Sequence, residues 1–142
     1  MTKWLLAANL CAALFLTGLI WTIQVVHYPL FARVGPDHFP AYESAHTARI
    51  TLIVAPSMLL ELAAAVALAL LRPAGVPAWA AWVSLALVGA IWVSTALLQI
   101  PRHGELAAGF NAAAHSALVA TNWIRTAAWT ARSALLAWLC FR

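Results

Sequence analysis

The sequence contains very few charged side chains. Only 8% of its 142 residues are Asp, Glu, Lys or Arg, whereas a soluble domain carries about 25%. Hydrophobic residues make up 65% of the chain. The eight basic residues are scattered rather than clustered, so the net charge of +4 does not indicate nucleic-acid binding. This composition excludes an ordinary soluble domain and predicts a membrane protein whose surroundings are the lipid bilayer.

Long apolar runs occupy most of the chain. A membrane-spanning helix needs about 20 such residues, and four runs meet this length, so we expect spans over about residues 4–26, 50–71, 78–100 and 114–139. We also expect an amphipathic helix at the membrane interface over residues 37–49, with Asp37 as its N-cap. The sequence thus predicts an all-α fold in which residues 1–142 form a single domain, a polytopic membrane four-helix bundle.

Prolines and polar residues between the runs suggest where helices begin and end. Pro29 is expected to end the first helix and Pro101 the third, because proline has no amide donor. Pro56 is expected to bend the second span. The proline- and glycine-rich residues 72–77 predict a tight turn, and Asn111 is expected to cap the fourth helix.

The two halves of the sequence are similar to each other. Gly-Leu-Ile-Trp at residues 18–21 is matched by Gly-Ala-Ile-Trp at residues 89–92. A phenylalanine and a histidine follow at corresponding positions in each half: Phe39 and His46, and Phe110 and His115. We therefore predict two tandem helical hairpins related by a pseudo-two-fold axis along the membrane normal. Chance similarity between tryptophan-rich apolar helices is the alternative.

The histidines are expected to share one face of the membrane. With four spans, the loops after the first and third helices lie on the same side, and all five histidines belong to that side. The termini and the 72–77 turn lie on the other side, whose charged residues are Lys3, Arg72 and Arg142. The short basic N-terminus favours cytoplasmic termini. We therefore expect a multi-pass protein of a bacterial inner membrane with its histidine face in the periplasm.

Polar side chains between apolar helices are costly, so their clustering indicates a functional site. We predict that His27, His46, His103 and His115 line one cavity and bind a redox metal, iron or copper in preference to zinc. Glu43 would assist, because Glu43 and His46 have the three-residue spacing of helical ligands in di-iron bundles. Haem is not expected, since axial histidines normally lie within helices and these lie near helix ends.

Two charged residues are expected deep in the membrane. Glu61 is about 11 residues beyond Ile50, roughly 16 Å at 1.5 Å per residue, and Arg125 is at nearly the same depth. An unpaired charge there costs about 2.5–3.5 kcal/mol, so we predict that Glu61 pairs with Arg125 or, failing that, with Arg132. The pair is either a structural ion pair or the floor of a site in which Glu43, Glu61 and Arg125 are the catalytic candidates.

Other polar residues near the histidines are candidates for binding a substrate. They are polar or aromatic side chains at the ends of the spans, where they could orient a small molecule or the metal ligands: Gln24, Tyr28, Arg49, Gln99 and Asn122.

Three short motifs carry a resemblance to a known family. They are residues 24–29, which begin with Gln and end with Tyr-Pro, residues 99–101, Gln-Ile-Pro, and residues 122–126, Asn-Trp-Ile-Arg-Thr. Together they resemble small four-helix bacterial membrane proteins and, distantly, the anthrone-oxygenase-like family. Its better-known members oxidise polycyclic aromatic anthrones to quinones. The resemblance implies oxygenase-type chemistry on a lipophilic aromatic substrate.

The leading hypothesis is a membrane-embedded oxidoreductase or oxygenase, metal-dependent, that acts on a lipophilic aromatic or quinone-like molecule. Two alternatives stay open. One is a non-enzymatic binder or carrier of a metal ion, a proton or a small solute. The other is an accessory subunit of a larger membrane complex, with self-association into a homo-oligomer also open. Metal analysis separates the first two hypotheses from the third, and turnover of a lipophilic donor separates the first from the second.

Overall fold

The structure, a computed structural model, describes residues 2–142, and of Thr2 and Lys3 it describes the backbone alone. The expected position of the Lys3 charge therefore lies outside the described part. Every regular element in residues 2–142 is helical, which confirms the all-α class. In chain order the elements are α1 (Thr2–Thr22), η1 (Ile23–His27), α2 (Tyr28–Leu30), η2 (Phe31–Arg33), α3 (Phe39–Leu71), α4 (Ala78–Ser94), η3 (Thr95–Gln99), α5 (Ile100–Ala107) and α6 (Ala112–Phe141).

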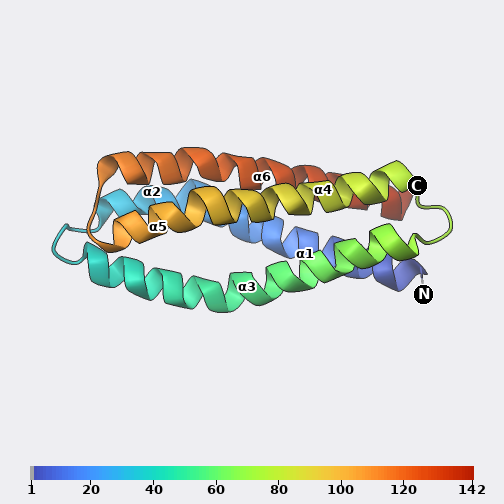
Figure 1. Ribbon diagram of the computed structural model, residues 1–142, viewed down its shortest axis with the longest axis horizontal. Coiled ribbons are helices and arrows are strands. Elements are labelled where there is room, and N and C mark those ends of the chain that lie inside the picture. The colour runs from blue at the N-terminus through green and yellow to red at the C-terminus, as the bar shows by residue number, and fades with distance from the viewer. Residues whose placement is uncertain (1) are drawn as a thin grey trace.

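Four long helical segments lie side by side (Figure 1). α1 contacts α3 and α6, and α4 contacts the same two helices from the other side. Both termini and the connection between α3 and α4 lie at one end of the molecule, whereas the loops before α3 and before α6 lie at the other end (Figure 1). The segments thus place the histidine-bearing ends together, as the sequence predicts.

The first and third helical segments do not end at their prolines, so that prediction is wrong. In each segment a five-residue π-helical stretch, η1 or η3, comes directly before the residue that precedes the proline. After η1 the amide of Tyr28 donates to the carbonyl of Ile23, five residues earlier. The proline then lies in the first turn of the next helix, where its missing amide removes no hydrogen bond. The chain therefore stays helical as far as residues 33 and 107.

α3 is a single helix of 33 residues. It covers both the expected interfacial helix and the second expected span, with no boundary at residue 50. Asp37 does not cap it, because the helix begins at Phe39 and the amides of His38 and Phe39 are already bonded to the carbonyls of Gly35 and Pro36. α3 changes direction near its middle (Figure 1), the part of the helix that contains Pro56.

The other two predicted boundaries are confirmed. Asn111 caps α6, since its Oδ1 accepts hydrogen bonds from the amides of Ala113 and Ala114 at 2.9 and 3.0 Å. A tight connection joins α3 to α4 over residues 72–77, with φ of 28° at Arg72 and 88° at Gly75.

Three helical segments are long and apolar enough to cross a membrane: Trp4–Arg33, Phe39–Leu71 and Ala78–Ala107. Large apolar side chains are exposed on the outside of every long helix, among them Leu14, Leu52, Val93 and Ile124. Such a surface suits lipid rather than water. These segments indicate that the protein lies in a membrane. α6 is less apolar because a polar stripe runs along its buried face.

Candidate functional site

A chain of hydrogen-bonded side chains crosses the histidine-bearing end of the molecule. The Tyr28 hydroxyl of α2 is 2.9 Å from Nε2 of His103 in α5, and Nδ1 of His103 is 2.5 Å from Oε1 of Glu43 in α3. Tyr28 and Glu43 are buried, with 3% and 0% of their surface exposed. Tyr28 directly follows η1, and His103 lies in α5, where the helix continues past Pro101. A carboxylate, an imidazole and a hydroxyl in this order can pass a proton along the chain.

Two further histidines pair beside this chain. Nε2 of His27 and Nδ1 of His46 are 2.9 Å apart, so one of the two nitrogens donates to the other. The rings of His46 and His103 have centroids 5.5 Å apart. Nε2 of His46 is buried without a hydrogen-bond partner. The structure therefore brings together three of the four predicted metal ligands, His27, His46 and His103.

His115 lies elsewhere. Its Nε2 is 2.8 Å from the Tyr28 carbonyl oxygen, and its ring packs against Phe31 and Phe110. In the described chain, residues 2–142, no group of three or more histidine, cysteine, aspartate or glutamate side chains is placed to hold a metal ion. Both ring nitrogens of His103 are already engaged by Tyr28 and Glu43.

A cavity of about 400 Å³, here called the lateral cavity, adjoins the hydrogen-bonded side chains of Tyr28 and His103. Its apolar wall comes mainly from α3, through residues such as Ile50, Val54 and Met58. Its polar lining consists of side chains from five other elements, together with two threonines of α3: Tyr28, Trp92, Thr95, Gln99, His103 and Arg125, and Thr47 and Thr51. An apolar pocket with a few convergent polar groups is the usual form of a small-molecule site.

Amide side chains form a cluster between η1 and α6. Gln24 Oε1 accepts from Asn122 Nδ2 at 2.8 Å, and Gln24 Nε2 donates to the carbonyl of Val119 at 3.1 Å. Arg125 Nη1 donates to Asn122 Oδ1 at 3.3 Å. Gln24 and Asn122, predicted to bind substrate, thus bind each other and link the two helices.

Gln99 and Arg49 were also predicted to bind substrate, and the structure separates them. Gln99 lines the lateral cavity and its Oε1 is buried without a partner. Arg49 is exposed and lines a shallower depression of about 320 Å³ on the outside of α3, together with His27, Tyr42 and His46.

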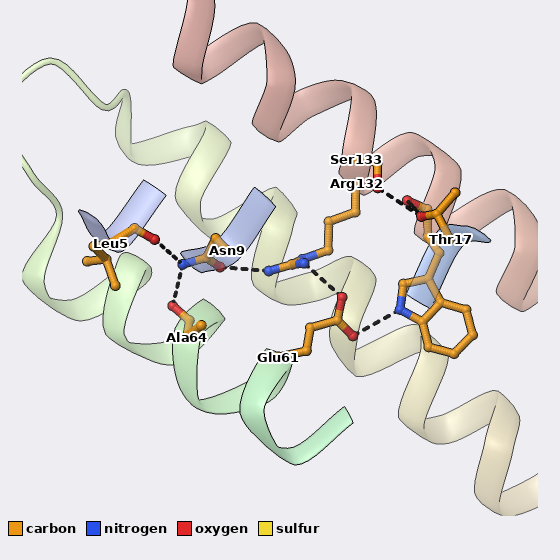
Figure 2. A network of polar contacts seen from close by, with 8 residues as sticks. Leu5, Asn9, Thr17, Glu61, Ala64, Arg132 and Ser133 are labelled. Carbon is orange, nitrogen blue, oxygen red and sulfur yellow. Dashed lines mark hydrogen bonds and ion pairs between the residues drawn. The ribbon is translucent and has the colours of Figure 1, made fainter. Parts of the chain in front are cut away.

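A second polar network lies deeper, around Glu61 (Figure 2). Glu61 Oε1 accepts from Arg132 Nη1 at 2.8 Å, and Oε2 accepts from Trp129 Nε1 at 2.9 Å. Arg132 Nη2 donates to Asn9 Oδ1 at 2.7 Å, and Asn9 Nδ2 donates to the carbonyl of Ala64 at 2.9 Å. The network ties α1, α3 and α6 together in the apolar interior.

Glu61 pairs with Arg132 and not with Arg125, so the first choice of partner is wrong and the second is confirmed. The expected position of Glu61 assumes that its helix enters the membrane at residue 50, whereas α3 begins at Phe39. Glu61 and Arg132 both lie about 20 residues from the start of their helices. Each is therefore about 30 Å from the histidine-bearing end of its helix. Arg125 lies about 10 Å nearer the histidines.

Sequence reasoning missed several polar contacts. Asn9 and Thr126 are buried and bonded to Arg132 and Gln24 respectively. Asn9 stands alone in an apolar helix, where one small polar residue gives little signal in the sequence.

Comparisons with protein-family models, with curated proteins and with solved structures found no match for this chain. The contacts described above are therefore what a functional assignment has to explain.

Proposed function

We propose that the protein is a membrane-embedded oxidoreductase that binds a lipophilic aromatic or quinone-like molecule in the lateral cavity. One observation carries the proposal: the hydrogen-bonded chain Tyr28–His103–Glu43 lies against an apolar cavity, and Tyr28 and His103 line that cavity. A cavity of about 400 Å³ suits a small ring system, since ligand pockets range from about 300 to 1,000 Å³.

The three side chains would serve as the base for a bound hydroxyl group. The Tyr28 oxygen accepts the ligand's proton while its own proton passes to Nε2 of His103. The His103 imidazolium that results is stabilised by Glu43, which accepts the hydrogen bond from Nδ1. Burial strengthens this arrangement, because charges interact more strongly away from water.

The redox step removes electrons as well as protons. Oxidation of a hydroquinone to a quinone breaks two O–H bonds and releases two protons and two electrons. Dioxygen can accept all of them and become hydrogen peroxide. In this scheme the lateral cavity binds the ring, the side chains of Tyr28, His103 and Glu43 move the protons, and dioxygen accepts the electrons.

The test is oxidation of a hydronaphthoquinone by the purified protein, followed as oxygen uptake and quinone absorbance. Tyr28→Phe removes the hydroxyl of the chain and should lower turnover about 100-fold, the typical size of a lost general base, with little change in affinity. Tyr42→Phe is the matched control, because Tyr42 lines the outer depression and not the lateral cavity. Equal activity of wild type and Tyr28→Phe would refute the role of the chain.

A non-enzymatic binder or carrier is the second candidate, and the same cavity favours it. It predicts saturable binding of the quinone without oxygen uptake. Wild-type protein that binds the ring and shows no turnover would support the carrier and refute the oxidoreductase.

We further propose that the four long segments form a membrane-spanning four-helix bundle with pseudo-two-fold symmetry. Its support is a set of contacts between corresponding residues of the two halves. Glu61 pairs with Arg132, 71 positions later, and Phe39 packs against Phe110 with ring centroids 5.1 Å apart. Residues related by a two-fold axis meet at that axis. The π-helical stretches η1 and η3 also occupy corresponding places. An experimental structure in which residues 2–71 do not superpose on residues 78–142 would refute the symmetry.

The proposed location is a bacterial inner membrane, with the termini in the cytoplasm and the histidine-bearing end in the periplasm. A reporter that fluoresces only in the cytoplasm should be active when fused after Arg142. Activity of a periplasm-specific reporter at the same position would show that the orientation is the opposite one.

Chemical cross-linking in the membrane distinguishes a monomer from a homo-oligomer or a subunit of a larger complex.

A further inference from the structure

We infer that the lateral cavity binds its ligand as an anion, through Arg125. This inference rests on the proposed function for the cavity and adds the charge of the ligand that the cavity selects. It follows from the surroundings of Arg125, from the balance of charges in the interior, and from the other polar atoms that line the cavity.

Arg125 is a buried cation with few partners. Its side chain is on the buried face of α6, with 5% of the residue exposed, and it lines the lateral cavity. Nη1 makes a long hydrogen bond of 3.3 Å to the neutral amide of Asn122, and Nε has no partner. The other polar group close to the guanidinium is the Tyr28 hydroxyl, which is also neutral. Its guanidinium carbon is 5.1 Å from the centroid of the Trp129 ring, a contact that attracts the cation without neutralising it.

Each of the four acidic residues is either paired with another residue or exposed in a loop. Glu61 is paired with Arg132, Glu43 with His103 and Glu105 with Arg102. The fourth and last acid, Asp37, lies exposed in the loop before α3. Among residues 2–142, therefore, no carboxylate side chain neutralises Arg125. A buried charge is normally paired, because leaving it alone in an apolar interior is costly.

Two more polar atoms of the same lining lack partners. They are Nε1 of Trp92, a donor, and Oε1 of Gln99, an acceptor. Together with Arg125 they match a ligand that carries an anionic oxygen and a nearby hydroxyl. The apolar wall of α3 matches a hydrocarbon body. A dihydroxyquinone with one of its two hydroxyls ionised has all three features, whereas an ionised monohydroxyquinone or a fatty acid shares the charge and the apolar body.

The test compares charged and uncharged probes on the wild-type protein in non-ionic detergent. The probes are hydroxynaphthoquinone, ionised at neutral pH, and its uncharged methyl ether, and binding is followed by quenching of tryptophan fluorescence. A charge-assisted hydrogen bond should make the anion bind about ten- to a hundredfold more tightly. Equal affinity for the two probes would overturn the inference while leaving the proposed cavity intact. Failure of both to bind would overturn the inference and the proposed function together.

Variants locate the charge that is responsible. Arg125→Gln should remove the preference for the anion, and Arg125→Lys should retain part of it. Arg102→Gln is the matched control, because Arg102 is exposed and paired with Glu105. A folded Arg125→Gln protein that still binds the anion more tightly than the methyl ether would overturn the role of Arg125.

A second pair of probes distinguishes an aromatic from an aliphatic source of the negative charge. Laurate and uncharged lauryl alcohol present an aliphatic chain in place of the ring. Tighter binding of hydroxynaphthoquinone than of laurate supports an aromatic acid. Tighter binding of laurate than of either quinone would keep the anion inference and overturn the quinone-like substrate of the proposed function.

Discussion

Glu61 and Arg132, 71 positions apart, form an ion pair of 2.8 Å in which both side chains are completely buried. The second oxygen of Glu61 accepts from Trp129, and the second terminal nitrogen of Arg132 donates to Asn9. These extra hydrogen bonds matter because a buried pair offsets the cost of desolvation only when its remaining polar atoms are also bonded. In this pair Nε of Arg132 is the one side-chain nitrogen or oxygen left without a partner. The pair therefore links α3 to α6 across the interior (Figure 2).

Removing one partner of this pair should destabilise the protein. Glu61→Gln leaves Arg132 buried without a counter-ion, and such a loss typically costs about 3–5 kcal/mol. We expect a clearly lower midpoint of thermal unfolding in detergent. Glu105→Gln, which breaks the exposed pair with Arg102, should change stability by about 0–1 kcal/mol. Similar unfolding midpoints for Glu61→Gln and wild type would contradict the structural importance of the pair.

The start of α6 depends on the cap at Asn111. Asn111→Ala removes two hydrogen bonds to the first turn and should lower stability by about 1 kcal/mol. Ser116→Ala, an exposed change farther along the same helix, should stay within about 0.5 kcal/mol of wild type. Denaturant unfolding in mixed micelles, followed by circular dichroism, measures both. A larger effect at Ser116 than at Asn111 would show that the cap contributes little.

Filling the lateral cavity should block ligand binding without unfolding the protein. Ala55 lines the cavity, so Ala55→Phe places a ring inside it and should weaken binding of hydroxynaphthoquinone. Ala45→Phe adds the same ring to the outer depression and is the control. Fluorescence titration and the melting midpoint are measured for both. Undiminished binding by a folded Ala55→Phe protein would place the ligand elsewhere.

The metal site predicted from the sequence can be tested on single histidines. His46 has a buried nitrogen without a partner beside His27 and His103, whereas His115 is bonded to the Tyr28 carbonyl. No group of three or more histidine, cysteine, aspartate or glutamate side chains in residues 2–142 is placed to hold a metal ion as the structure stands, so the measurement starts with the wild type. If the wild type binds iron or copper, His46→Ala should lose the metal and His115→Ala should keep it. Elemental analysis after dialysis is the measurement. Wild-type protein that binds neither metal rules out the metal proposal.

The sequence by itself determined the features that depend on local physical chemistry. Long apolar runs predicted the helices, the proline- and glycine-rich residues 72–77 predicted a tight connection, and Asn111 predicted the start of α6. Asn122, Arg125 and Arg132 are three and seven residues apart, a spacing that places them on one face of a helix, and all three are buried. Counting the helices correctly placed the histidine-bearing ends at one end of the molecule.

The tertiary structure alone decided which residues meet. Proline predicts a helix end from its missing amide, but a π-helical stretch realigns the backbone hydrogen bonds and carries the helix through Pro29 and Pro101. The partner of Glu61 depended on where α3 begins, since an error of about ten residues shifts the depth by about 15 Å. Contacts among Tyr28, His103 and Glu43 join three separate segments. Their geometry follows from the packing of those helices and from no pattern within any one of them.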